Sequence, residues 1–141
     1  MNDKQTGFML IEALIGMLLF SIGIVGVIAL QASAISISSD ATYRGEASYL
    51  ADQIIGQMWA DRLNVANYQL NVQGAACAPG GNSSTNQNVS AWLQGMSLPG
   101  SSTLMQQILV NPTSNAVTVT LCWQPSKAKA PHKIVVTTSI N

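Results

Sequence analysis

A single carboxylate interrupts the longest apolar stretch of this sequence. Between Phe8 and Leu30 every side chain is apolar, a glycine or a serine, except that of Glu12. A carboxylate inside a membrane-spanning segment costs about 2.5–3.5 kcal/mol on insertion scales and is by default a functional-site hypothesis. Glu12 lies about one helical turn into the stretch, so it is either such a functional group or a side chain that reaches the membrane surface.

The apolar stretch is long enough to cross a membrane as one helix. At about 1.5 Å per residue, a helix over residues 8–30 spans about 34 Å, more than the hydrocarbon core of a bilayer, about 30 Å. Gly16, Gly23 and Gly26 permit close packing between helices. The sequence therefore predicts a single membrane-spanning helix.

A short polar segment, residues 1–7, precedes the apolar stretch and differs from an ordinary signal peptide. A signal peptide has its cleavage site after the apolar region, whereas the candidate cleavage residue here, Gly7, comes before it. Removal of this leader would leave the helix on the mature protein and create an ammonium group on Phe8. In a fibre, Glu12 of one subunit can pair with that ammonium on a neighbour, which offsets much of the penalty for burying the carboxylate.

Residues 7–12, Gly-Phe-Met-Leu-Ile-Glu, closely resemble the processing motif of type IV prepilins, usually Gly-Phe-Thr-Leu-Ile-Glu. The resemblance implies that a membrane-bound prepilin peptidase cleaves between Gly7 and Phe8 and N-methylates Phe8. It also implies that Glu12 acts in subunit assembly. The protein is thus expected to be the substrate of an enzyme and not itself an enzyme.

The apolar stretch resembles, more narrowly, that of the PilV minor pilins (type IV pilus modification proteins). The matching segments are Ser-Ile-Gly at residues 21–23 and Leu-Gln at residues 30–31. This resemblance implies a structural subunit that takes part in initiating pilus assembly near the tip and supports adhesion or twitching motility. The alternatives are a minor pseudopilin of a type II secretion system and a membrane-anchored binding module that is never assembled.

The resemblance also implies the partners and the location of the protein. Its partners would be the prepilin peptidase, other minor and major pilins, the inner-membrane assembly machinery and a tip adhesin. Before assembly, the helix over residues 8–30 would lie in the bacterial inner membrane, with the head, residues 31–141, in the periplasm. After assembly the protein would belong to the extracellular fibre.

The helix is expected to continue beyond the membrane as an amphipathic segment over residues 31–65. Apolar residues recur there at three- and four-residue spacing, which places them on one helix face. They are Tyr43, Ala47, Leu50, Ile54 and Met58. A second row of apolar residues widens this face, namely Ala51, Ile55, Trp59 and Leu63. We expect this face, with the Trp59 ring, to pack on the core of the head.

The rest of the head is predicted to be a loop over residues 66–103, with a short helical turn at 89–93, and a small antiparallel sheet over residues 104–141. The clearest strand is 117–123, in which four large apolar residues alternate with smaller ones. These four are Val117, Val119, Leu121 and Trp123, the expected core face. A second strand is expected at 134–138, and residues 104–110 suit either a third strand or a helical turn. The predicted fold class is α+β, the type IV pilin fold.

Two cysteines, Cys77 and Cys122, both lie after the apolar stretch. In a domain exported to an oxidising compartment they form a disulfide, which closes a loop worth about 4 kcal/mol in the chain-entropy model. Alternation along the strand places Cys122 on the sheet face away from the helix. The alternative is two free thiols. No Cys-X-X-Cys pair is present, so neither a redox motif nor a zinc site is supported.

The composition excludes several other classes of function. Only 9% of the residues are charged and the formal net charge is zero, so nucleic-acid binding has no electrostatic support. The single histidine, His132, has no cysteine or carboxylate near it in the sequence. No metal-ligand spacing occurs, and we expect neither a metal nor a cofactor.

Overall fold

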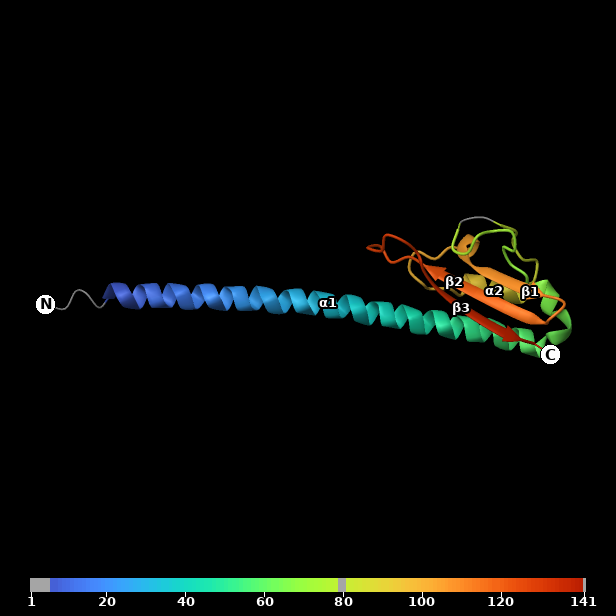
Figure 1. Ribbon diagram of the computed structural model, residues 1–141, viewed down its shortest axis with the longest axis horizontal. Coiled ribbons are helices and arrows are strands. Elements are labelled where there is room, and N and C mark those ends of the chain that lie inside the picture. Colours follow the sequence, from blue (N-terminus) through green and yellow to red (C-terminus); the bar gives the residue numbers. More distant parts are fainter. Residues whose placement is uncertain (1–5, 79–80, 141) are drawn as a thin grey trace. The chain divides into compact units, whose positions relative to one another are not determined.

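The structure is a computed structural model that describes residues 6–78 and 81–140 (Figure 1). Residues 1–5 of the predicted leader therefore lie outside the described residues. The elements in chain order are α1 (Thr6–Ala60), η1 (Arg62–Tyr68), α2 (Gln87–Gln94), η2 (Thr103–Met105), β1 (Gln107–Asn111), β2 (Ala116–Trp123) and β3 (His132–Ser139). The chain divides into two compact units, Met1–Ala41 and Thr42–Asn141, and the boundary falls within α1.

The first unit consists, in its described part, of the N-terminal portion of α1. No proline interrupts this portion, so its backbone hydrogen bonds continue without a break. Every side chain from residue 8 to residue 38 is exposed in the single chain. Up to Leu30 these exposed side chains are apolar except those of Glu12 and Ser21, and a helix that is apolar on nearly all sides needs lipid or other helices around it.

The second unit is built on the remaining portion of α1, which buries one face. Ala47, Leu50, Ala51, Ile54 and Met58 are all at most 6% exposed, at the predicted three- and four-residue spacing. The core opposite this face comes mainly from β2, with further side chains from β1, α2, the end of η1 and three connecting or terminal positions. Its members are Val117, Val119, Leu121, Trp123, Ile108, Val89, Trp92, Tyr68, Leu70, Leu98 and Ile140.

The prediction that Trp59 and Leu63 belong to the buried face is wrong. The Trp59 side chain is 45% exposed and that of Leu63 is 92% exposed. Trp59 follows Met58 by about 100° around the helix, which takes its ring off the face that Met58 buries. Tyr68, which is fully buried, contributes its ring to the core instead.

Helix α1 ends at Ala60 and not at residue 65, because Asp61 starts a tighter turn. The Asp61 carboxylate accepts hydrogen bonds from Asn64 Nδ2 at 2.6 Å and from Tyr68 Oη at 3.3 Å. The Asn64 backbone is not helical, with φ −117° and ψ 16°. These contacts turn the chain back toward the core and bury Tyr68.

The sheet is antiparallel, with the order β1-β2-β3 and β2 at its centre. Gln107 pairs with Thr120 across β1 and β2, and Trp123 pairs with His132 across β2 and β3. Figure 1 shows the three strands along the C-terminal part of α1 (green). The predicted strands at 117–123 and 134–138 and the predicted core face of β2 are thus confirmed. The segment 104–110, left open in the sequence, divides into the end of η2 and the beginning of β1.

The predicted loop over residues 66–103 contains more structure than the single helical turn expected at 89–93. Helix α2 forms there because the Asn86 side chain caps its first backbone N–H groups, those of Asn88 and Val89. Trp92 fixes α2 to α1, since its Nε1 donates to the Leu50 carbonyl at 2.8 Å. This bond satisfies the buried indole N–H.

A four-residue turn, Leu98–Ser101, seats this segment against the end of β2. The Ser101 N–H donates to the Leu98 carbonyl at 3.2 Å, and the Gln124 N–H donates to the Pro99 carbonyl at 2.9 Å. Gly100 has φ +62°, and a Cβ there would lie 2.2 Å from the Gln124 carbonyl oxygen. Proline second and a left-handed glycine third are typical of a type II turn.

The substitution Gly100→Ala is therefore expected to destabilise the head by at least about 2 kcal/mol, from backbone strain together with the clash. Denaturant unfolding of the full chain in detergent, followed by tryptophan fluorescence, measures this. Gly95→Ala is the matched control, because the Gly95 φ is −81° and a Cβ there would meet atoms no closer than 3.5 Å. Equal unfolding midpoints for the two variants would contradict the expectation.

Candidate functional site

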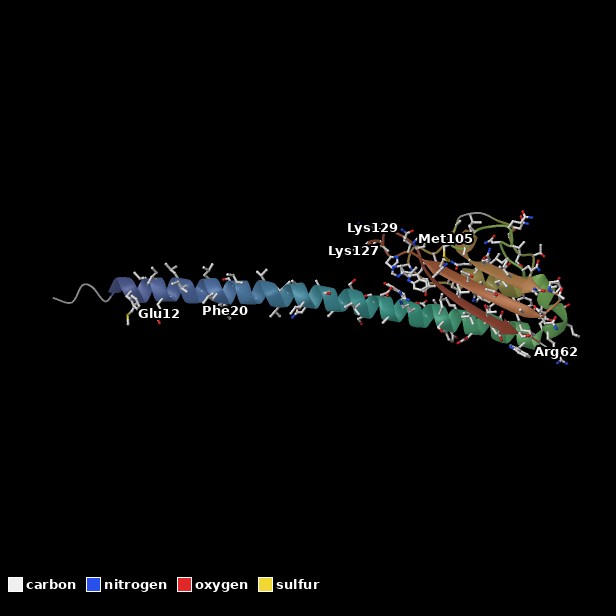
Figure 2. The ribbon with its side chains drawn as sticks, in the orientation of Figure 1. Glu12, Phe20, Arg62, Met105, Lys127 and Lys129 are labelled. Atoms are coloured by element: carbon white, nitrogen blue, oxygen red, sulfur yellow. A yellow bond between two sulfur atoms is a disulfide. The ribbon has the colours of Figure 1, made fainter. Side chains whose placement is uncertain are left out.

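The predicted site at the start of α1 lies on one continuous helix. Gly7, Phe8 and Glu12 all fall within Thr6–Ala60, and Phe8 and Glu12 are separated by about one turn. Side chains four residues apart share a helix face, so Phe8 and Glu12 project from the same side. Phe8 is 72% exposed, and the Glu12 side chain projects outward from the helix (Figure 2).

Cleavage after Gly7 would change the electrostatics of this end of the helix. It would make Phe8 the first residue of α1 and place an ammonium group where the helix dipole is positive. A cation at that position is unfavourable, whereas a carboxylate one turn away is favourable. The chemistry that this arrangement supports is ion pairing, which requires no nucleophile and no proton transfer.

The surface around this site is apolar and open to neighbours. Helix α1 is long and apolar enough to cross a membrane, with a mean hydropathy of 2.7 in its most apolar window and none of that window buried. A Cβ at Gly16, Gly23 or Gly26 would meet nothing within 4 Å. A neighbouring helix could therefore approach the α1 backbone closely at these glycines. This segment meets the requirements of a single-pass membrane anchor.

The second predicted site, the cysteine pair, is a disulfide. Cys77 and Cys122 are joined, with a Cα–Cα distance of 5.4 Å. Cys122 occupies the predicted face of β2, opposite to the core residues Leu121 and Trp123, yet it is fully buried. The segment after η1 covers it, and Cys77 adopts φ +64° there.

Buried amides, which the sequence analysis did not single out, hold this segment on the sheet. The Gln106 side chain accepts from the Cys122 N–H at 2.8 Å and donates to the Cys122 carbonyl at 3.0 Å. The Asn71 side chain donates to the Gln106 carbonyl at 2.7 Å, and the Gln107 side chain donates to the Gly74 carbonyl at 2.7 Å. Since a buried polar group is costly without a partner, these bonds fix the segment around the disulfide. In the sequence, the only sign of these buried amides was that Gln106 and Gln107 stand in a segment with a weak strand pattern.

His132, which has no cysteine or carboxylate near it in the sequence, lies in the sheet as the first residue of β3. Its ring contacts that of Trp123 edge-on, with a centroid distance of 5.8 Å. In the described part of the chain, no three His, Cys, Asp or Glu side chains are grouped so that they could hold a metal ion. The structure thus brings Cys77 and Cys122 together, and it leaves Glu12 apart on the exposed portion of α1.

The fold, a long apolar N-terminal helix packed through its C-terminal part on a three-stranded antiparallel sheet, is the α+β architecture of the type IV pilins. Comparisons of the chain with models of protein families, with curated proteins and with solved structures find no match. The likeness to prepilins therefore rests on residues 7–12 and on the fold.

Proposed function

We propose that this protein is a minor pilin of a type IV pilus, a structural subunit that takes part in initiating pilus assembly near the tip. One observation carries the proposal: a prepilin-like cleavage motif opens an apolar stretch, residues 8–30, whose only carboxylate, Glu12, is one helical turn from the expected cleavage point. A plain membrane anchor has no need of that carboxylate, whereas a fibre of packed helices can pair it with the Phe8 ammonium.

In this proposal the apolar part of α1 lies in two environments in succession, first the membrane and then the fibre. The prepilin peptidase removes residues 1–7 and methylates Phe8 while the apolar part of α1 lies in the inner membrane and the head lies in the periplasm. The assembly machinery then transfers the subunit into the fibre, among other minor and major pilins and beside a tip adhesin. The same apolar side chains contact lipid first and neighbouring helices afterwards, so the transfer exchanges one apolar surrounding for another.

Mass spectrometry of the mature N-terminus tests the first step. We expect the chain recovered from membranes to begin at N-methyl-Phe8, because the scissile bond follows a glycine, which has no Cβ to hinder the peptidase. Gly7→Val is expected to leave the leader attached, and Thr6→Val is the matched control. A wild-type chain that still begins at Met1 would refute the pilin proposal and favour an unassembled membrane anchor.

Deletion of the gene, scored both for surface pili and for protein secretion, separates the pilus from the secretion system. Loss of piliation and twitching with normal secretion supports the minor pilin. Loss of secretion with normal twitching would replace it by a minor pseudopilin of a type II secretion system, which would share the motif and the helix.

A further inference from the structure

One end of the head carries an apolar hollow of about 420 Å³. Its lining comes from η1, with Arg62, Leu63 and Val65, from the end of β1 and the β1–β2 connection, with Val110 and Pro112, and from Ile140. Leu63, at 92%, is the most exposed large apolar side chain of the described residues. Figure 2 shows Arg62 at this end of the head, with Lys127 and Lys129 at the opposite end of the sheet.

Arg62 is an available cation at the rim of this hollow. Its side chain is exposed, and within the described part of the chain no hydrogen bond or ion pair engages it. The carboxylate of its sequence neighbour Asp61 already accepts hydrogen bonds from Asn64 and Tyr68. From residue 62 onward the sequence contains no aspartate or glutamate. A hollow of this kind fits a large apolar side chain that has a carboxylate beside it.

The same chain displays such a pair on the outward face of α1. Tyr49 is 66% exposed, and Asp52, three residues on, lies on the same helix face and is exposed as well. The second unit has three carboxylates, and two of them have partners: Glu46 accepts from Ser97, and Asp61 is engaged as described. Of these three described side chains, Asp52 is the one without a hydrogen bond or ion pair.

Within one chain the two surfaces cannot meet. Asp52 lies eight residues before the end of α1, about 12 Å along the helix, and Arg62 lies beyond that end. We infer that the hollow around Arg62 and Leu63 binds the Tyr49–Asp52 face of a second copy of this chain. The Tyr49 ring enters the hollow against Leu63, and the Asp52 carboxylate pairs with the Arg62 guanidinium.

A contact of this type joins two different surfaces, so each copy keeps one hollow and one Tyr49–Asp52 face available for a further copy. Such heterologous contacts extend into rings or open helical arrays. All the residues concerned lie in the second unit, and the contact uses neither Gly7 nor Glu12. It can therefore fail without any change in the processing and piliation on which the proposed function is tested.

Site-specific crosslinking in cells tests the contact with the full-length chain. Two differently tagged copies are co-expressed, one with Ala66→Cys beside the hollow and one with Gln53→Cys beside Asp52. Both residues are exposed. We expect an oxidant to give several-fold more mixed dimer on non-reducing gels than the control pair Ser126→Cys and Gln53→Cys, whose first member lies in the exposed β2–β3 loop. Equal yields from the two pairs would overturn the inference.

Charge exchange tests the pairing itself. Arg62→Glu in the first copy is expected to lower the mixed-dimer yield several-fold, and Asp52→Arg in the second copy is expected to restore it. Lys129→Glu, an equal change of charge at the other end of the sheet, should leave the yield unaltered. Resistance of the Cys77–Cys122 disulfide to mild reduction, measured by alkylation of the thiols released, verifies that each variant is folded, because Cys122 is fully buried in the folded head. An unaltered yield in Arg62→Glu, or no recovery in the combined variant, would overturn the pairing.

Discussion

The variant Glu12→Ala is expected to reach the membrane and lose its leader normally, yet to be depleted more than about tenfold in sheared pili. Removal of the carboxylate leaves the apolar helix intact and lowers its insertion cost. In the fibre, however, the Phe8 ammonium of a neighbour loses its partner among apolar side chains, and an uncompensated buried charge costs about 3–5 kcal/mol. Immunoblots of the pilus and membrane fractions measure both quantities.

Two control variants accompany Glu12→Ala. The first separates the charge of Glu12 from its volume, and the second tests whether the loss of any exposed charge lowers the amount in pili. Glu12→Gln keeps the shape and removes the charge, so we expect it to be depleted nearly as strongly as Glu12→Ala. Lys129→Gln removes an exposed charge of the head and should leave cleavage, membrane insertion and the amount in sheared pili unaffected. Normal amounts of Glu12→Ala in sheared pili would refute the pairing with Phe8.

Removal of the disulfide, in Cys77→Ser/Cys122→Ser, is expected to lower the free energy of unfolding of the head by about 4 kcal/mol. The crosslink spans 45 residues, and its loss enlarges the conformational freedom of the unfolded chain. A domain stable by about 5–15 kcal/mol would lose a large share of its stability. Trp123, which is fully buried and adjacent to Cys122, gives a fluorescence signal for denaturant unfolding of the full chain in detergent.

The amides around the disulfide supply a second expectation for this variant. The Asn71 and Gln107 side chains hold the segment after η1 by hydrogen bonds that do not require the disulfide, so the double variant should still fold at low denaturant. The wild-type chain under reducing conditions is the matched comparison and should unfold at nearly the same denaturant concentration. A loss below about 1 kcal/mol in both would show that the crosslink hardly constrains the unfolded chain.

The sequence by itself determined the two halves of α1 and the core face of β2. An uninterrupted apolar run, a three- and four-residue repeat and a two-residue alternation each depend on local geometry alone. The expected cleavage between Gly7 and Phe8 rests on the resemblance of residues 7–12 to the prepilin motif, and helix geometry adds only that Glu12 lies about one turn from Phe8. The pairing of Cys77 with Cys122 needed only that the chain has two cysteines, both after the apolar stretch.

Only the tertiary structure decided where burial departs from these repeats. Trp59 and Leu63 continue the apolar pattern yet are exposed: Trp59 lies off the face that Met58 buries, and the turn at Asp61 ends the helix before Leu63 and brings Tyr68 into the core. Cys122 lies on the face expected to be outward but is buried, because the segment after η1 crosses it.

The hollow beside Arg62 also could not be predicted from the sequence. Its walls come from η1, from the β1–β2 turn and from Ile140, three segments that are far apart in the chain. Periodicity reports which face of one element is apolar. It does not report which elements meet, because that depends on how the whole chain fills its core.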